Sequence, residues 1–183
     1  NVAIGPDAMG AEVEGNASTA VGVGALQNQT SATSTTVANV GVGYYAGNEI
    51  TSGTRNTLIG GFAGDELTTG YYNATLGYAS LSEDTQGATA VAVGYAALGN
   101  QNFTTATVHY NVAVGYNAGT GVTTGINNVL IGGLAGDALT DADRNVAIGT
   151  SALSADTLGS RSTAVGYGTL NAQNFTTATQ TYN

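Results

Sequence analysis

The nine residues from Asn111 to Gly119 read NVAVGYNAG, and close variants of this stretch recur along the whole chain of 183 residues. Each variant closes a short apolar run with a glycine, and the interval from one such glycine to the next is either 17 or 21. The ten glycines are Gly5, Gly22, Gly43, Gly60, Gly77, Gly94, Gly115, Gly132, Gly149 and Gly166. A short repeated spacing is typical of architectures in which each unit stacks on the next. The sequence therefore predicts coils stacked along one axis.

The three residues before each of these glycines are predicted to form a β-strand. The residue directly before the glycine is always Val, Ile or Leu, and the residue two positions earlier is mostly β-branched. Because side chains alternate along a strand, these two positions share one face. We expect this face to be interior, with Val93, Val114 and Ile131 in contact along one column. The residue between the two positions is usually Ala, which predicts close packing on the opposite face as well.

Two polar columns support the same architecture. Asn stands four residues before the glycine in seven of the ten repeats, and stacked amides can hydrogen-bond to one another along a column. A Thr recurs in the polar turn of most repeats. The glycine content and the β-branched strands argue against helix. We therefore predict an all-β fold, a parallel β-solenoid of 17-residue and 21-residue coils that are stacked about 4.8 Å apart.

The sequence leaves two alternatives for the number of chains in the solenoid. One 17-residue coil holds few large apolar side chains, so either the solenoid is very flat or several chains share a core. We favour three chains, a homotrimer, because the Ala columns suit close approach around a common axis.

A longer period lies above the short one, because the same order of short and long intervals returns after every four coils. We interpret residues 1–183 as a single repetitive segment made of the blocks 1–72 and 73–144 and the partial block 145–183. The chain begins and ends within the pattern, so we expect it to be a segment of a longer repeating protein.

The 21-residue coils have four extra residues, which are expected to bulge outward as a loop once per block. The motif QNFTTAT occurs unchanged in two of them, at residues 101–107 and 173–179. It places Phe103 and Phe175 in the loops. Each phenylalanine is expected either to fold back over its own wall or to form an outward patch for a glycan or a partner fibre.

Charge excludes several classes of partner. Three basic residues against twelve acidic ones give a net charge of −9. Such a surface repels phosphate, so neither nucleic acid nor an anionic membrane surface is an expected partner. The apolar runs are far shorter than the roughly 20 residues that span a bilayer, so membrane insertion is not expected.

Two sets of side chains are candidates for binding. Glu49, Glu66 and Glu83 occupy the same position in three successive coils, about 5 Å apart. Stacked carboxylates either turn into water, keep a proton, or bind a hard cation such as Ca²⁺. No other cofactor is indicated. Tyr78 and Tyr95 follow the glycine in adjacent coils, where stacked aromatic rings either cover the strand edges or bind sugar.

Catalysis is not predicted. His109 is the only histidine, so a Ser-His-Asp arrangement would require it, yet we expect it in a loop beside Tyr110. Asp141 and Asp143 have the spacing of a depolymerase carboxylate pair but have no counterpart in the other blocks. Ice binding would require two regular Thr columns on one strand, and only one is regular.

The stretches NTLIGGFAG, NVAVGYNAG and STAVGYGTL resemble the N-T-A-[IV]-G-Y-x-A-L repeats of bacteriophage tail fibres and related bacterial surface proteins. They are more loosely similar to the S-x-A-x-G head repeats of trimeric autotransporter adhesins, which form a trimeric left-handed β-roll with a shorter coil. The resemblance implies an extended trimeric fibre, extracellular or on a virion surface, that supports attachment without catalysis in its shaft. The alternative function is a β-solenoid that itself binds carbohydrate or another surface.

Overall fold

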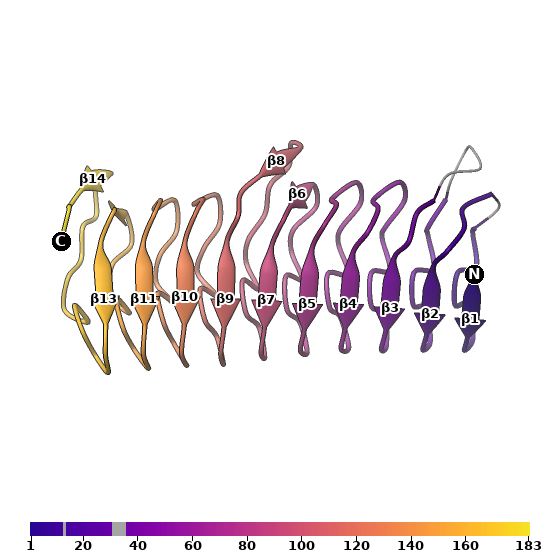
Figure 1. The fold of residues 1–183 in the computed structure, drawn as a ribbon, viewed down its shortest axis with the longest axis horizontal. Coiled ribbons are helices and arrows are strands. Elements are labelled where there is room, and N and C mark those ends of the chain that lie inside the picture. Colours follow the sequence, from indigo (N-terminus) through magenta and orange to yellow (C-terminus); the bar gives the residue numbers. More distant parts are fainter. Residues whose placement is uncertain (13, 31–35) are drawn as a thin grey trace.

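The computed structural model describes residues 1–12, 14–30 and 36–183, and in these residues it is all-β, without helix. Ten parallel strands form one sheet and lie side by side in sequence order, with the chain termini at opposite ends of the row (Figure 1). The strands are β1 (Val2–Ile4), β2 (Thr19–Val21), β3 (Val40–Val42), β4 (Thr57–Ile59), β5 (Ala74–Leu76), β7 (Val91–Val93), β9 (Val112–Val114), β10 (Val129–Ile131), β11 (Val146–Ile148) and β13 (Thr163–Val165). The predicted parallel β-solenoid is confirmed.

The register of the sheet follows the spacing of the repeats. Val129 of β10 pairs with Val146 of β11 across a short coil, and Val93 of β7 pairs with Val114 of β9 across a long one. Both kinds of coil thus bring equivalent strand residues into register. The four extra residues of a long coil therefore lie outside the sheet.

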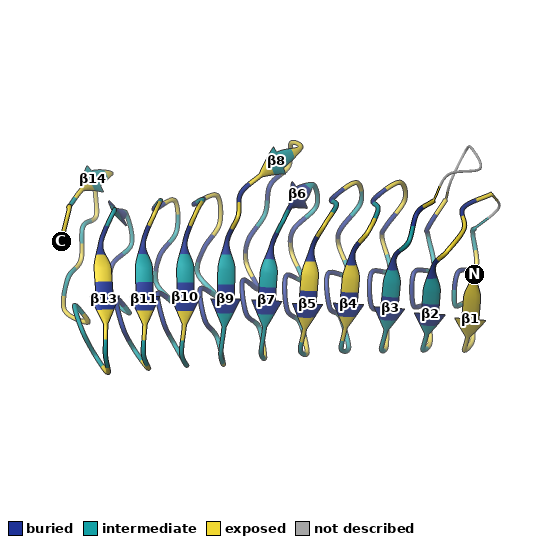
Figure 2. Cartoon of the chain, in the orientation of Figure 1, coloured by how far each residue is buried: buried dark blue, intermediate teal, exposed yellow. Residues whose placement is uncertain are grey.

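The predicted interior column, however, is wrong. The central residue of nearly every strand is buried, whereas the first and third residues point outward (Figure 2). Val93, Val114 and Ile131 do stack along one column, but on the outer face, and Ile131 is 37% exposed. The central residues, such as Leu58 and Leu130, are completely buried.

Interior volume explains this inversion. Four residues after the glycine, several coils place a fully buried leucine in the interior, for example Leu98. In that coil the centre of the strand is Ala92. Where the strand centre is itself leucine, as at Leu58, the later position is Gly64, and a Cβ added there would lie 2.9 Å from a methyl group of Leu58. No coil has leucine at both positions, and where neither is leucine, as in the coil of Gly119, leucines of the neighbouring coils fill the space. The interior therefore has no room for the predicted Val and Ile columns.

The glycine at the end of each strand is required by close approach between coils. Gly94 has φ +131°, and a Cβ added to it would lie 2.3 Å from the carbonyl oxygen of Gly115 in the next coil. Only glycine satisfies both conditions.

The Asn column bonds mainly to backbone rather than amide to amide. The Asn128 side chain accepts from the Asn145 N–H at 2.9 Å and donates to the Ala142 carbonyl at 2.8 Å. Its side-chain contact with Asn111, at 3.4 Å, is weaker. Each buried Asn therefore joins its own coil to the next.

Where the structure describes its loop, the long coil after β7 extends beyond the main wall, as predicted, whereas residues 31–35 of the first long coil lie outside the described residues. In Figure 1, β8 (Thr107–Val108) rises above the row and pairs with β6 (Gly87–Ala88). In the next block β14 (Thr179–Gln180) pairs with β12 (Gly159–Ser160).

Candidate functional site

The outward residues of the ten strands form one apolar surface, which we call the outer sheet face. It consists of the first and third residues of each strand, and all are Val, Ile, Leu, Thr or Ala. Large side chains remain open to solvent even away from the ends, with Ile131 and Ile148 each 37% exposed and Leu76 51% exposed. Ten strands about 4.8 Å apart make this stripe roughly 43 Å long. A contiguous exposed apolar stripe of this kind is a candidate interaction surface.

Three tyrosines, Tyr78, Tyr95 and Tyr116, follow the glycines of successive coils, and we call them the tyrosine column. The rings of Tyr78 and Tyr95 are 5.8 Å apart, those of Tyr95 and Tyr116 are 5.4 Å apart, and both pairs are nearly parallel. The structure thus brings together Tyr78 and Tyr95, as the sequence predicted. Because Tyr95 is stacked on both sides, its ring edge and hydroxyl face solvent rather than its ring faces, which disfavours sugar stacking there.

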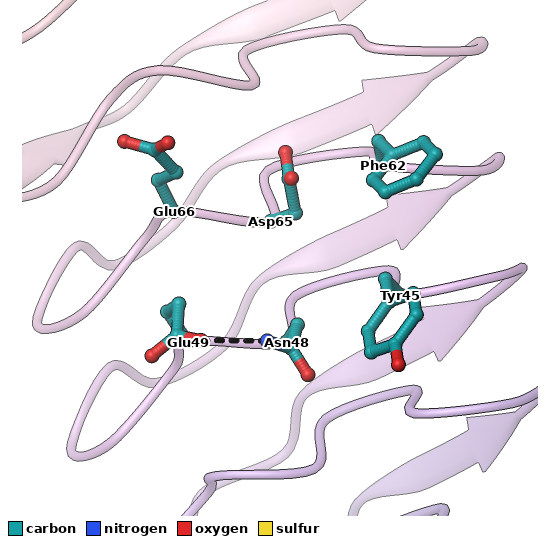
Figure 3. A pocket seen from close by; sticks show the side chains of 6 residues that line it. All are labelled: Tyr45, Asn48, Glu49, Phe62, Asp65 and Glu66. Atoms are coloured by element: carbon teal, nitrogen blue, oxygen red, sulfur yellow. Dashed lines mark hydrogen bonds between the residues drawn. The ribbon is translucent and has the colours of Figure 1, made fainter.

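A pocket of about 270 Å³ lies between the coils of β3 and β4 (Figure 3). Its acidic residues are Glu49, Asp65 and Glu66, and Glu49 accepts a hydrogen bond of 2.6 Å from Asn48. Burial raises the pKa of Asp65 to about 6, with the charges of Glu66 and Glu49 adding to the shift. One buried oxygen of Asp65 has no hydrogen-bond partner, which fits a carboxyl group that tends to keep its proton.

The proposed cation ladder of Glu49, Glu66 and Glu83 has no preformed site. Within residues 1–12, 14–30 and 36–183, no group of three or more His, Asp or Glu side chains is arranged to hold a metal ion. Glu83 is exposed and does not line the pocket. Calcium binding at this ladder stays a prediction.

The second block contains a buried polar cluster that the sequence analysis missed. Asp84, Gln101 and His109 are all fully buried. The Gln101 amide nitrogen donates to Asp84 at 2.7 Å and lies 3.0 Å from Nε2 of His109. The side-chain oxygen of Gln101 accepts a hydrogen bond of 2.9 Å from the side-chain nitrogen of Asn111, which fixes the orientation of the Gln101 amide. Nε2 of His109 is 3.8 Å from the Asp84 carboxylate.

Burial dominates the titration of this cluster. It lowers the pKa of His109 to about 4, so the ring is neutral at pH 7. It raises the pKa of Asp84, while hydrogen bonds from Gln101 and from the backbone N–H groups of Phe103 and Gly87 act in the opposite direction. His109 follows β8 in the long coil, as expected, but its ring is turned inward and buried. With both groups enclosed, no dissolved substrate can reach the pair.

Equivalent pairs occur in the other blocks. Gln173 donates to Asp156 at 2.6 Å in the third block, and Gln29 donates to Glu12 at 2.6 Å in the first. The position of His109 is occupied there by Thr181 and Val37, respectively. The signal in the sequence was the recurrence of an acidic residue and Gln at the same places in successive blocks.

The two loop phenylalanines differ in burial. Phe103 is 7% exposed and stacks on the His109 ring at 4.9 Å, with 5° between the ring planes. Phe175, in the last coil, is only partly buried. The contact of Phe103 favours the packing role over an outward patch, and the corresponding loop residues of the first block, 31–35, lie outside the described residues.

Asp141 and Asp143, the candidate carboxylate pair of a depolymerase, both accept hydrogen bonds from the preceding coil. Asp141 accepts from the Thr124 hydroxyl at 2.8 Å, and Asp143 accepts from the Ile126 N–H at 2.9 Å. Both line a recess of about 270 Å³ together with Arg144.

Comparisons with known proteins give no relative for this arrangement. No protein-family model matches the chain, and no curated protein or solved structure matches it. The described part of the chain contains no helix that could serve as a membrane span.

Proposed function

We propose that this chain is a shaft segment of an extracellular or virion-surface fibre, of the phage tail-fibre or trimeric-adhesin type, that supports attachment to a host or another surface. In this proposal three copies associate through the outer sheet face. The observation that carries it is an uncharged apolar stripe, uncovered in the single chain, on a molecule whose net charge is −9.

A second copy of the chain is the partner that fits this face best. Two identical stripes have the same spacing between strands, so their side-chain columns stay in step along the whole length. The lack of charge on the stripe removes the repulsion that the acidic remainder of the surface would impose on self-association. A nucleic acid or basic partner would instead require charged groups on the face.

The area of the face does not distinguish two copies from three. With two side-chain columns and a width of roughly 10 Å, each stripe covers on the order of 400 Å², and each chain buries that area once in either assembly. The Ala columns do not support three copies either, because they lie inside each chain. The choice of three copies therefore rests on the resemblance of the repeats to those of trimeric fibres.

Because the first and third strand residues lie on the outer face rather than in the core, a charge placed there is expected to disturb association rather than folding. If Val114 were interior, as the sequence predicted, Val114→Asp would destroy a buried core, but Val114 is half-buried on the outer face. We now expect the variant to fold and to fail in association. The matched control is Thr123→Asp, which introduces the same charge at an exposed position of the same coil outside the sheet.

Sedimentation velocity tests the proposal. The unmodified chain and the Thr123→Asp control are expected at three times the 18.1 kDa chain mass, and Val114→Asp at the mass of one chain with an unchanged circular dichroism spectrum. An unmodified chain that stays monomeric at high concentration would overturn the proposal and leave a solenoid that acts as a single chain.

A further inference from the structure

The tyrosine column combines close approach with exposure. Its ring separations of 5.8 and 5.4 Å are close to the spacing of about 4.8 Å between coils, so each ring lies over its neighbour. Tyr78, Tyr95 and Tyr116 are nevertheless 52%, 50% and 58% exposed. Three phenols are therefore held in contact at a surface that a dissolved oxidant can reach.

We propose that the tyrosine column is a site of oxidative cross-linking, in which a peroxidase-type one-electron oxidant with hydrogen peroxide joins neighbouring coils through dityrosine. The co-reactant class is peroxide, and the products are Tyr78–Tyr95 or Tyr95–Tyr116 links within one chain. The proposal depends on the ring geometry and does not require the fibre function.

The chemistry uses only the two phenols and the peroxide. Each phenol loses one electron and its hydroxyl proton, which gives two phenoxyl radicals. The radicals couple through ring carbons ortho to the oxygen, and the hydrogen atoms on those carbons then move to the oxygens, which restores both phenols. One carbon–carbon bond forms, and the two electrons and two protons reduce one hydrogen peroxide to two waters.

The fold confines coupling to these three rings. In the coil before Tyr78 the equivalent position is Gly61, and the ring beside Tyr78 is Phe62, edge-on at 5.7 Å, which has no phenol to oxidise. In the coil after Tyr116, the equivalent position is Gly133. Parallel pairing of β5 with β7 and of β7 with β9 holds the three coils in register. Tyr95 is the only member with a partner on each side.

Other tyrosine pairs have a different geometry. Tyr44 with Tyr45, and Tyr71 with Tyr72, are adjacent in sequence, and their rings cross at 88° and 79°. Coupling within such a pair would leave both residues in one peptide and would not join coils. The Tyr78–Tyr95 product is therefore distinguishable from the products of those pairs after digestion, because it joins two peptides.

A link between coils would resist uncoiling. In a stacked-repeat protein each coil contacts only its neighbours, so the chain can open locally from one coil to the next. A covalent bond across two coils removes that route at the linked pair. We expect the cross-linked chain to unfold at a higher temperature than the untreated chain.

Peptide mapping tests the proposal. The chain is treated with peroxidase and hydrogen peroxide and is then cleaved before each aspartate, which separates residues 65–83 from residues 84–136. The Tyr78–Tyr95 link is expected to join these two peptides, with the fluorescence of dityrosine. Tyr95→Phe keeps the ring and its stacking, and it should abolish the joined peptides and most of the fluorescence. Tyr110→Phe removes an unstacked tyrosine that is 60% exposed, and it should leave both unchanged.

Two results would overturn the proposal. The first is a Tyr95→Phe variant, folded by circular dichroism, that still yields the joined peptides in undiminished amount. The second comes from a mixture of chains with light and heavy nitrogen: joined peptides that combine the two isotopes in the proportion expected for random pairing would place the link between chains rather than between coils.

Discussion

At the scale of single residues, two interior positions of a coil have side chains of complementary size: the strand centre and the position four residues after the glycine. Leucine at the strand centre goes with glycine later in the coil, as in Leu58 with Gly64 and Leu130 with Gly136. Alanine at the centre goes with leucine at the later position in several coils, as in Ala92 with Leu98, although Ala113 goes with Gly119. The later position has a left-handed backbone in either case, with φ of 54° at Gly64 and 51° at Leu98. The backbone is therefore constant, and only the location of the leucine changes.

The complementary sizes predict that a second substitution partly restores the stability lost through the first. Leu58→Ala should lower the free energy of unfolding by about 2–5 kcal/mol through the cavity that it leaves. Gly64→Leu alone should also destabilise, because a Cβ there would lie 2.9 Å from side-chain atoms of both Leu58 and Leu67. The double variant should recover only part of the loss, because it removes the contact with Leu58 but keeps Leu67, whose place in the coil of Leu98 is taken by Gln101. Urea denaturation of the four proteins gives the coupling energy, and additive losses in the double variant would contradict the volume argument.

The buried histidine predicts a specific loss of stability in acid. The folded-state pKa of His109 is about 4, below its ordinary value of 6.5. Its contribution is therefore complete above pH 6.5 and is lost as the pH falls towards 4, by up to about 3 kcal/mol. His109→Thr copies Thr181 of the third block and should remove this loss. Melting temperatures from pH 7.5 to 4 check the slope, and parallel curves for the two proteins would contradict the assignment.

Asp65 should act in the opposite direction. Its folded-state pKa is raised from 3.8 to about 6, so the folded chain gains stability as the pH falls through 6 and loses it as the pH rises. Asp65→Asn should then raise the melting temperature at pH 7 and change it little at pH 4. A calcium titration at pH 7 separates the cation hypothesis, because bound Ca²⁺ would stabilise the unmodified chain and make Asp65→Asn harmful instead.

At the scale of elements, the sequence predicted the strands and their register well. Constant spacing and a glycine that tolerates no Cβ, such as Gly94, determine which residues pair. It could not predict which strand face is interior, because both faces are apolar and alternation alone does not rank them. That choice depends on volume supplied from elsewhere in the coil, by residues such as Leu98. The Asp84 cluster was missed because its members look like ordinary turn residues until the coil closes around them.

The Asn column predicts a cost that depends on position. Asn128→Ala would leave the Asn145 N–H and the Ala142 carbonyl without their side-chain partner, and each unsatisfied buried group costs about 1–3 kcal/mol. Exposed Asn100, which lies outside the left-handed region, is the matched control, and Asn100→Ala should cost much less. Thermal unfolding of both variants measures the difference. Equal effects would mean that the column is not a main connection between coils.

At the scale of the whole molecule, the solenoid has a core of its own in every coil. Buried leucines and alanines form one continuous cluster from Met9 to Ala164. Association through the outer sheet face would therefore add stability to coils that are already filled, rather than supply a missing core. Each added coil extends both the core and the stripe. A longer chain should therefore be more stable even where the chains do not associate.

This modular construction predicts that length can be changed by whole blocks. A variant with a second copy of residues 73–144 placed after residue 144 keeps the glycine spacing at both joints, so its strands should stay in register. Four further coils should lengthen the particle by about 19 Å and raise the free energy of unfolding, because stability in stacked repeats grows with the number of interfaces. Small-angle X-ray scattering measures the longest dimension. A copy of residues 73–136 ends within a coil and breaks the glycine spacing, so this control should lose stability instead. If both insertions lengthened and stabilised the particle equally, register between coils would not be what holds the solenoid together.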